Sequence, residues 1–249
     1  MRTISKNGKL FRVREAGRSA FWDRVEQGYW EPTLFDAFDA FVDQDHSYID
    51  LGAWIGPTVL YACQLARHAY AVEPDPVAFA QLQENVDLNP ELRDRIDLFN
   101  VCIGDSSGTV RMGSRGSAGD SSSSMLLPDC DTSWTVDSLT LQSFTEANHI
   151  TDCGFIKMDT EGAEAIILPN IIDYLRQHKP TLHVSLHPLL YKKPKEDLER
   201  IIEALRIYRS IYDEHGRKVV VRYYALSQAN LTKRDYSLVA TDREWTVGP

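Results

Sequence analysis

The sequence predicts an α/β fold: an open, mostly parallel sheet with helices on both faces and an antiparallel hairpin at its C-terminal end. Between residues 47 and 205, short apolar runs alternate with segments of helical periodicity, the pattern of parallel strands joined by helices. Acidic residues and glycines follow several of these runs, where open α/β sheets bind ligands. The last strands have no helix between them, which favours a hairpin.

Bulk composition narrows the class of protein. The chain has 249 residues, of which 43% are hydrophobic and 25% charged, so it can bury a full core. A formal charge of −9 argues against a protein that binds the phosphate backbone of nucleic acids. The four cysteines form no C-x-x-C pair and are interpreted as thiols in a reducing compartment. Without an apolar leader or a membrane-length apolar stretch, we expect a cytoplasmic protein with no membrane span.

The N-terminal region is expected to cover the sheet. Alternation over Lys9–Arg14 predicts a short edge strand, and apolar residues at helical spacing between Phe21 and Asp45 predict one or two helices. Between them lies Trp30-Glu31-Pro32, which we interpret as the start of a helix with Trp30 packed on the sheet, in preference to a ligand contact. Residues 1–46 are therefore predicted to form a cap of a strand and helices, and residues 47–249 one globular unit.

The central feature of the sequence is the segment Asp50–Gly56. An apolar strand leads into it, and a helical pattern begins at Pro57, so it predicts a tight loop at a helix N-terminus. A dinucleotide-binding loop reads G-x-G-x-x-G, whereas this one reads D-x-G-x-W-x-G. A carboxylate at its first position disfavours a phosphate and favours a cation or a hydroxyl.

A second acid follows the next strand. Ala69–Val72 ends at Glu73, 23 positions after Asp50, and an acid at this distance in a βαβ unit accepts hydrogen bonds from both ribose hydroxyls. The two acids together predict a site for an adenosine with a positive tail that lacks phosphate. S-adenosylmethionine fits this description better than NAD.

The third strand is predicted over Ile96–Asp105, after a helix over Pro76–Asn89. Asp105 at its end either accepts from the adenine amino group or belongs to an ordinary turn, and the sequence leaves both open. The serine-rich segment (residues 106–133) has too few apolar residues for a core element, so we expect a disordered insertion or a mobile lid. A short strand follows at residues 134–139, with Asp137 as the expected N-cap of the next helix.

Four ionisable side chains gather at the end of the next strand. The apolar segment Phe155–Met158 predicts a buried strand that carries Lys157 and is followed by Asp159, Glu161 and Glu164. The density of charge at this sheet edge favours a functional role for the first three. Glu164 falls in the first turn of a helix, where the helix dipole is an equally good explanation for a carboxylate.

The rest of the chain completes the sheet. Thr181–Pro188 is predicted as a fifth strand, and His187 near its end is placed to take a proton from an alcohol. A helix over residues 198–205 precedes closing strands at 210–212, 219–224 and 236–240. A parallel sheet finished by an antiparallel hairpin is the layout of class I methyltransferases.

Six motifs, in order, give the sequence a resemblance to a known family. They are W-E-P (Trp30–Pro32), D-x-G-A-x-x-G (Asp50–Gly56), E-P-x-P (Glu73–Pro76), I-G-D (Ile103–Asp105), D-S-L (Asp137–Leu139) and I-K-x-D-x-E-G-A-E (Ile156–Glu164). With these motifs the sequence resembles the FkbM-type S-adenosylmethionine-dependent methyltransferases from about Trp30 to His187. The resemblance implies O-methyl transfer to a hydroxyl, frequently on a sugar of a polysaccharide, glycolipid or glycosylated natural product.

The resemblance also assigns residues. It implies that the cofactor is held by Asp50, Gly52, Glu73 and Asp105, and that the acceptor side is lined by Lys157, Asp159, Glu161 and His187. The same motifs contain further residues that we expect at the cofactor site, namely Glu31, Ala53, Gly56 and Pro74. The sequence departs from the family at Trp54 and Pro57, where Asn and an aromatic residue are frequent, and at Ser185, where Glu is frequent.

In the mechanism that these residues suggest, His187 or Asp159 is the base, and Lys157 orients Asp159 or the acceptor oxygen. A divalent ion such as Mg²⁺, bridging Asp159, Glu161 and a sugar diol, is a further alternative, because carboxylate oxygens suit magnesium. Three other functions remain open: an NAD(P)-dependent oxidoreductase, a methyltransferase of a small molecule, protein or nucleic acid, and a cofactor-binding module without activity. The first would have glycine in place of Asp50.

Overall fold

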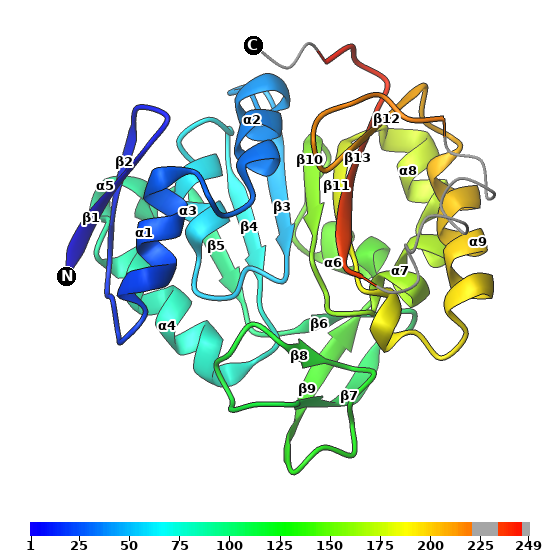
Figure 1. Cartoon of the computed structure of the whole chain (residues 1–249), viewed down its shortest axis with the longest axis horizontal. Coiled ribbons are helices and arrows are strands. Elements are labelled where there is room, and N and C mark those ends of the chain that lie inside the picture. The colour runs from blue at the N-terminus through cyan, green and yellow to red at the C-terminus, as the bar shows by residue number, and fades with distance from the viewer. Residues whose placement is uncertain (221–233, 246–249) are drawn as a thin grey trace.

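The computed structural model describes residues 1–220 and 234–245, and within them a seven-stranded sheet forms the centre of the fold (Figure 1). Its strands, in spatial order, are β12 (Ser210–Asp213), β13 (Tyr236–Thr241), β11 (Thr181–Leu186), β10 (Cys153–Met158), β3 (Ser47–Leu51), β4 (Ala69–Val72) and β5 (Ile96–Phe99). The five strands from β11 to β5 pair in parallel, and β13 runs antiparallel to both of its neighbours. The predicted mostly parallel sheet with an antiparallel C-terminal end is confirmed. Of the strand predicted at 219–224, residues 219 and 220 are described and are not in a strand, and 221–224 lie outside the described residues.

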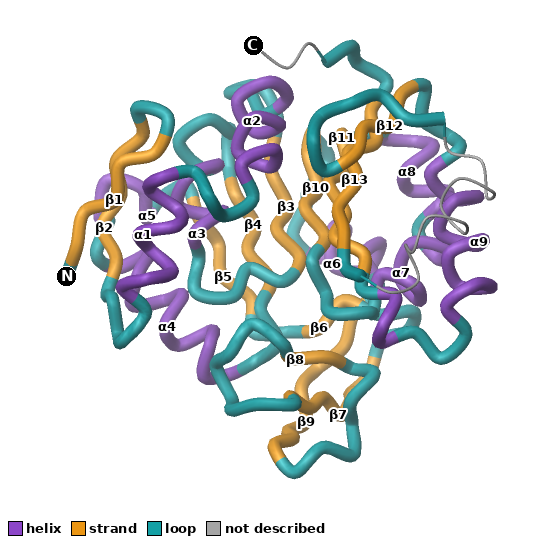
Figure 2. The backbone as a smooth tube through the Cα atoms, in the orientation of Figure 1, coloured by secondary structure: helices purple, strands orange, loops and turns teal. Residues whose placement is uncertain are grey.

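Helices cover both faces of this sheet, as Figures 1 and 2 show. One face is covered by α1 (Ser19–Gln27), α2 (Pro32–Phe41), α3 (Pro57–Ala62), α4 (Pro76–Asp87) and α5 (Pro90–Arg93), and the other by α6 (Leu141–Ala147), α7 (Glu164–Asn170), α8 (Ile172–His178) and α9 (Pro194–Leu205). Consecutive strand residues point to opposite faces, so Tyr48 packs with the first group and Ile49 with the second. Helix α7 contains Pro169 and ends one residue later at Asn170, and α8 begins at Ile172. Among the described helices, none is long and apolar enough to cross a membrane.

The N-terminal hairpin packs on the first group of helices. It consists of β1 (Arg2–Lys6), which was not predicted, and β2 (Lys9–Val13), which was. Asn7 and Gly8 join them with φ values of 45° and 77°, which is the left-handed conformation of a two-residue hairpin turn. Phe11 is buried in the same hydrophobic cluster as residues of α3, so the hairpin extends the core beyond the sheet.

The serine-rich segment is not the unstructured insertion that its composition predicts. It contributes to a four-stranded sheet of β6 (Cys102–Ile103), β7 (Gly108–Ser114), β8 (Ser123–Ser124) and β9 (Thr132–Leu139), in the order β6-β9-β7-β8. The prediction of a disordered insertion is wrong, because β7 pairs with β8 and β9, and Asp120 accepts from the hydroxyls of Ser114 and Ser122. The alternative of a mobile lid stays a prediction. The strand predicted over Ile96–Asp105 is divided between β5 and β6.

Asp137 does not cap α6. It is exposed within β9, and the N-cap is Thr140, whose hydroxyl accepts from the backbone N–H of Ser143 at 3.0 Å. The expectation failed because Asp137 lies inside β9, which ends at Leu139 as the pattern at 134–139 predicted, so Thr140 is the residue that directly precedes the helix.

The carboxyl ends of β3 and β10 meet at the point where the strand order reverses direction, and in open α/β sheets this point forms the ligand crevice. The loop after β3 packs against the loop that follows β10, with Gly52 next to Asp159. A Cβ atom added at Gly52 would lie 1.9 Å from the carbonyl oxygen of Asp159, and the φ of Gly52 is +83°. Glycine is therefore required at this position by both the close approach and the backbone conformation.

We predict that Gly52→Ala destabilises the chain by more than the about 1–2 kcal/mol that a left-handed alanine alone costs. Gly8→Ala is the matched control, because Gly8 has a similar φ of +77° but no atom within 4 Å of its added Cβ. Chemical denaturation of both variants measures the difference. Equal losses of unfolding free energy in the two variants would contradict the role of the Gly52–Asp159 contact.

Candidate functional site

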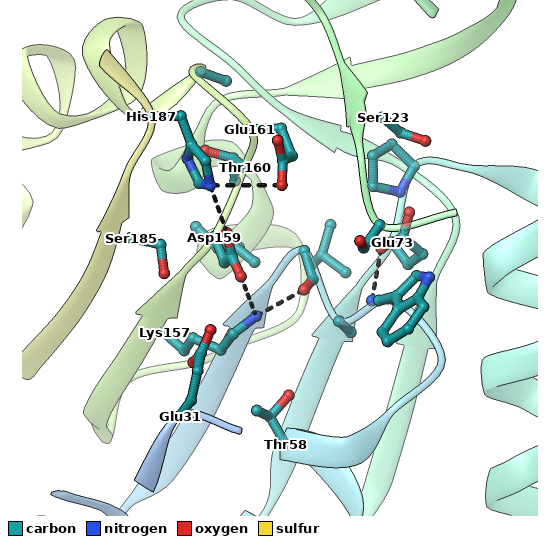
Figure 3. A pocket seen from close by; sticks show the side chains of 18 of the residues that line it. Glu31, Thr58, Glu73, Ser123, Lys157, Asp159, Thr160, Glu161, Ser185 and His187 are labelled. Carbon is teal, nitrogen blue, oxygen red and sulfur yellow. Dashed lines mark hydrogen bonds and ion pairs between the residues drawn. The ribbon is translucent and has the colours of Figure 1, made fainter. Parts of the chain in front are cut away.

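A pocket of about 540 Å³ lies at the carboxyl edge of the sheet (Figure 3). Of the residues assigned from the sequence, its lining includes Glu31, Gly52, Ala53, Glu73, Pro74, Lys157, Asp159, Glu161 and His187. Figure 3 shows Glu73 at one end of the pocket and His187 at the other, with Lys157 and Asp159 between them. The structure thus brings nine of the twelve assigned residues to one cavity and leaves out Asp50, Gly56 and Asp105.

Asp50 lies behind the pocket wall and is completely buried. Its carboxylate accepts hydrogen bonds from the hydroxyls of Tyr48 at 2.7 Å and Thr58 at 2.6 Å, and from Lys157 Nζ at 3.0 Å. Lys157 Nζ also donates to the backbone oxygen of Gly52 at 2.7 Å. Asp50 therefore fixes the loop after β3 from below, in contrast to the expected direct contact with a ligand.

Gly56 and Asp105 are the other two residues that the pocket does not include. Gly56 is a packing position, since an added Cβ would lie 2.7 Å from the side chain of Leu82 in α4. Asp105 is exposed in the turn after β6, and its carboxylate accepts a hydrogen bond from the hydroxyl of Ser106. Of the two readings of Asp105 that the sequence left open, the turn is the one that its position supports, because the strand ends two residues earlier at Ile103.

Glu73 forms the floor at one end of the pocket. It is 5% exposed, and its carboxylate accepts from the backbone N–H groups of Trp54 at 2.7 Å and Asp75 at 2.8 Å. Burial raises the pKa of Glu73 to about 7, and these two hydrogen bonds act in the opposite direction. Each carboxylate oxygen can accept a second hydrogen bond, so Glu73 can hold a pair of hydroxyls.

Glu31 reaches the pocket from the N-terminal cap. It precedes α2 with a left-handed φ of 43°, and its Oε2 atom is buried without a hydrogen-bond partner among the described residues. Burial raises the pKa of Glu31 to about 7, and the charge of Asp159 adds to this effect. A buried carboxylate oxygen without a donor indicates a place for a ligand N–H or O–H group.

Aromatic rings line the wall next to Glu31. Phe21 packs edge to face against Trp30 at 5.2 Å and Trp54 at 4.8 Å between ring centroids, and all three line the pocket. Trp30 is half-buried and packs on Phe35 of α2, and it also lines the pocket, so the preference for packing on the sheet over a ligand contact is not confirmed.

Part of the serine-rich segment covers the pocket. Its Gly119 oxygen accepts from Arg18 at 2.6 Å and from the Trp54 ring at 3.1 Å, while Gly119 N–H donates to Asp75 at 2.8 Å. The hydroxyl of Ser123 donates to the same Asp75 oxygen at 2.8 Å. Asp75, which the sequence analysis did not identify, is therefore both the N-cap of α4 and the anchor of this cover.

The opposite end of the pocket holds His187, Asp159 and Glu161. His187 Nε2 lies 3.5 Å from Asp159 Oδ1 and 3.5 Å from Glu161 Oε1. The Oδ1 atom of Asp159 is buried and has no hydrogen bond in the described part of the structure. These three residues follow β10 and β11, neighbouring parallel strands, which is why residues 26 positions apart meet here.

Glu164 fixes the imidazole from the other side, and this role was not clear from the sequence. Glu164 is completely buried. Its Oε1 atom accepts from the hydroxyl of Tyr191 at 2.7 Å and from the backbone N–H of His187 at 2.7 Å. The same atom lies 3.2 Å from the ring nitrogen Nδ1 of His187. Because Glu164 lies in the first turn of α7, the helix dipole alone could explain a carboxylate at this position. The sequence signal for a role of Glu164 at the site was its position three residues after Glu161, in the segment E-G-A-E.

The pKa values at this end follow from the crowding of carboxylates. Burial acts to lower the pKa of His187, but the hydrogen bond to Glu164 and the charges of Glu164, Asp159 and Glu161 outweigh it and raise the pKa to about 10. Burial acts to raise the pKa of Glu164, and its bonds to His187 and Tyr191 lower it overall. Burial raises the pKa of Glu161 to about 7.

Comparisons with known proteins found one family profile and a set of similar solved structures. The sequence profile described as "Methyltransferase FkbM domain" matches residues 50–217, whereas no curated protein sequence matches the chain. Among solved structures, the chain is similar to the methyltransferase FkbM from Methylobacillus flagellatus KT, with 17% identity and a TM-score of 0.49 over 92% of this chain and 56% of that one. It thus spans little more than half of the Methylobacillus protein.

Two further solved structures are similar to this chain at lower identity. One is a Streptococcus mutans protein in complex with SAH, with 11% identity and a TM-score of 0.46 over 84% of this chain and 96% of that one. The other is an rRNA methylase from Streptococcus thermophilus, with 9% identity and a TM-score of 0.47 over 85% and 95%. Because the family profile covers more than half of the sequence, from the first loop of the pocket to beyond His187, the chain belongs to the FkbM methyltransferase domain family.

Proposed function

We propose that the chain is an S-adenosylmethionine-dependent O-methyltransferase whose acceptor is a hydroxyl of a sugar in a polysaccharide, glycolipid or glycosylated natural product. The observation that carries this proposal is the division of one pocket into two ends. Glu73 offers acceptors for a pair of hydroxyls at one end, and Asp159 offers a carboxylate oxygen without a partner at the other.

The pocket residues fit S-adenosylmethionine. Glu73 would accept from the ribose hydroxyls, and the apolar side chains of Ile103 and Met125 would pack against the adenine. Glu31 Oε2, which has no hydrogen-bond partner among the described residues, would accept from the ammonium of the methionine end. The acidic lining suits a ligand with a sulfonium charge.

The same features argue against a dinucleotide cofactor. Helix α3 begins with Pro57, which has no N–H group to offer a pyrophosphate, and the carboxylates of Glu31 and Glu73 face the pocket. An NAD(P)-dependent oxidoreductase is therefore the weaker alternative. A module that binds the cofactor without turnover would not need a base beside the acceptor, whereas Asp159 is available for that role.

The protein's part in the reaction is alignment and proton removal. S-adenosylmethionine supplies a methyl carbon that its sulfonium already activates, so the acceptor oxygen has only to be placed in line and to lose its proton. His187 Nδ1 faces Glu164 and Nε2 lies 3.5 Å from Asp159 Oδ1 and Glu161 Oε1, while Asp159 Oδ1 makes no hydrogen bond among the described residues. Asp159 is therefore the better base, with His187 positioned beside it.

The first test is calorimetric titration with S-adenosylhomocysteine, with NADH as the control ligand. We expect binding of S-adenosylhomocysteine in the micromolar range and no binding of NADH. Binding of NADH alone would overturn the proposed function, including the roles of Glu31 and Glu73.

The pKa of Glu73, which burial raises to about 7, makes cofactor binding depend on pH. The ionised carboxylate accepts from both ribose hydroxyls, so the affinity for S-adenosylhomocysteine should fall by up to about tenfold per unit as the pH decreases below 7, and level off above it. Titrations between pH 5.5 and 8.5 measure this. Glu73→Gln should bind weakly, and any pH dependence that it retains reports Glu31, whose pKa is also near 7. An unchanged pH profile in Glu73→Gln would contradict the assignment.

Asp159→Asn tests the base. We expect kcat to decrease by about 10²–10⁴-fold, because the amide cannot take the acceptor proton, with little change in the affinity for S-adenosylhomocysteine. Turnover is measured with the first saccharide that accepts a labelled methyl group in an acceptor screen. Asp173→Asn is the control, since its carboxylate is 98% exposed on α8. Near-normal turnover of Asp159→Asn would exclude Asp159 as the base.

A further inference from the structure

The three side chains at the acceptor end of the pocket have the spacing of metal ligands. One donor atom from each of Asp159, Glu161 and His187 lies within 4.8 Å of the other two. Figure 3 shows the carboxylates on the side of the ring that faces the pocket. The loop after β10 supplies both carboxylates and the end of β11 supplies the imidazole, so a rigid sheet edge carries all three.

The distances from His187 Nε2 to the two carboxylates are those of ion pairs, and they are close to the spacing of neighbouring ligands around an ion. His187 Nε2 lies 3.5 Å from an oxygen of Asp159 and of Glu161, and it makes no hydrogen bond to a described residue. An ion with ligand bonds of about 2.1 Å places neighbouring donors about 3.0–3.4 Å apart, in octahedral or tetrahedral geometry. Only small side-chain movements separate the observed cluster from such a site.

Two independent observations point to a cation at this place. The side chain of His187 is 9% exposed, and its other nitrogen faces the buried carboxylate of Glu164 at 3.2 Å, the outer partner that orients a metal-binding imidazole in many proteins. Asp159 Oδ1, which faces the same Nε2 atom at 3.5 Å, is buried and makes no hydrogen bond to any residue that the structure describes. The imidazole is thus fixed with Nε2 aimed at a carboxylate oxygen that it approaches to 3.5 Å without a hydrogen bond.

We propose that Asp159, Glu161 and His187 bind one borderline divalent cation of the first transition series, and that this ion holds two adjacent hydroxyl oxygens of the acceptor. The two carboxylates alone would suit Mg²⁺, as the sequence pattern suggested. The imidazole nitrogen shifts the preference, because nitrogen ligands favour transition ions over Mg²⁺.

The second half of this inference rests on the proposed function. Three protein ligands on a six-coordinate ion leave three positions, enough for a vicinal diol and one water. The Oδ2 atom of Asp159, which lies 4.0 Å from Lys157 Nζ, would remain available to the acceptor proton. The acceptor class is accordingly narrowed to sugars with two neighbouring free hydroxyls.

The experiment is calorimetric titration of the full chain with CoCl₂ and with MgCl₂, together with the visible absorption of bound Co²⁺. We expect one Co²⁺ per chain and an affinity at least about tenfold higher than for Mg²⁺. Glu161→Gln and His187→Ala should each weaken Co²⁺ binding by at least about tenfold and change the spectrum. Glu196→Gln, on the exposed face of α9, is the matched control and should bind Co²⁺ normally.

Titration of each protein with S-adenosylhomocysteine separates the outcomes. If S-adenosylhomocysteine binds and no Co²⁺ binds, or if Co²⁺ binds equally to Glu161→Gln and His187→Ala, the metal site is wrong and the methyltransferase assignment stands. Tighter binding of Mg²⁺ than of Co²⁺ would overturn the preference for a transition ion. If Co²⁺ binds as expected and S-adenosylhomocysteine does not, the site is supported and the proposed function fails.

Discussion

The buried ion pair between Lys157 and Asp50 is the interaction on which the rest of the site depends. The two residues are directly opposite in β10 and β3, and their side chains are 3% and 0% exposed. Removing one partner from such a pair typically costs about 3–5 kcal/mol, because the other charge is left buried. Here Tyr48, Thr58 and the Gly52 oxygen complete the hydrogen bonds, so the pair joins the strands and the loop after β3 in one unit.

This pair also determines the electrostatic character of the pocket. Lys157 points its charge toward Asp50 and Gly52, and the pocket wall keeps carboxylates such as Glu31, Glu73 and Glu161. A phosphate-bearing cofactor would be repelled by these carboxylates, whereas a sulfonium compensates their charge. Under the proposed function, the preference for S-adenosylmethionine over a phosphate-bearing cofactor therefore has two causes. One is the set of carboxylates in the pocket wall, and the other is that Lys157 pairs with Asp50 and the Gly52 oxygen.

The sequence predicted most of the fold and the location of the site, because both depend on strand ends. Apolar runs gave the parallel strands, and the residues that follow them, Gly52, Glu73 and Asp159, do line one pocket. Asp50 was expected in the pocket wall because the sequence placed it after the strand, whereas it lies inside β3 and points to the same face as Tyr48, behind the wall. The order within the serine-rich segment was missed because it arises from serine and aspartate hydrogen bonds, which composition does not reveal.

Glu164 shows why a local explanation can conceal a functional one. As the first residue of α7 it is fully consistent with the helix dipole, and nothing within α7 suggests more. Its role depends on β11 pairing with β10, which places His187 against it, and on η1 (Pro188–Leu190), which brings Tyr191 within 2.7 Å. Glu164 thereby orients the imidazole so that Nε2 faces Asp159 and Glu161. A negative charge behind the ring and two in front make the acceptor end a place that attracts a cation, whether that cation is a proton on the imidazole or a metal ion between the three ligands.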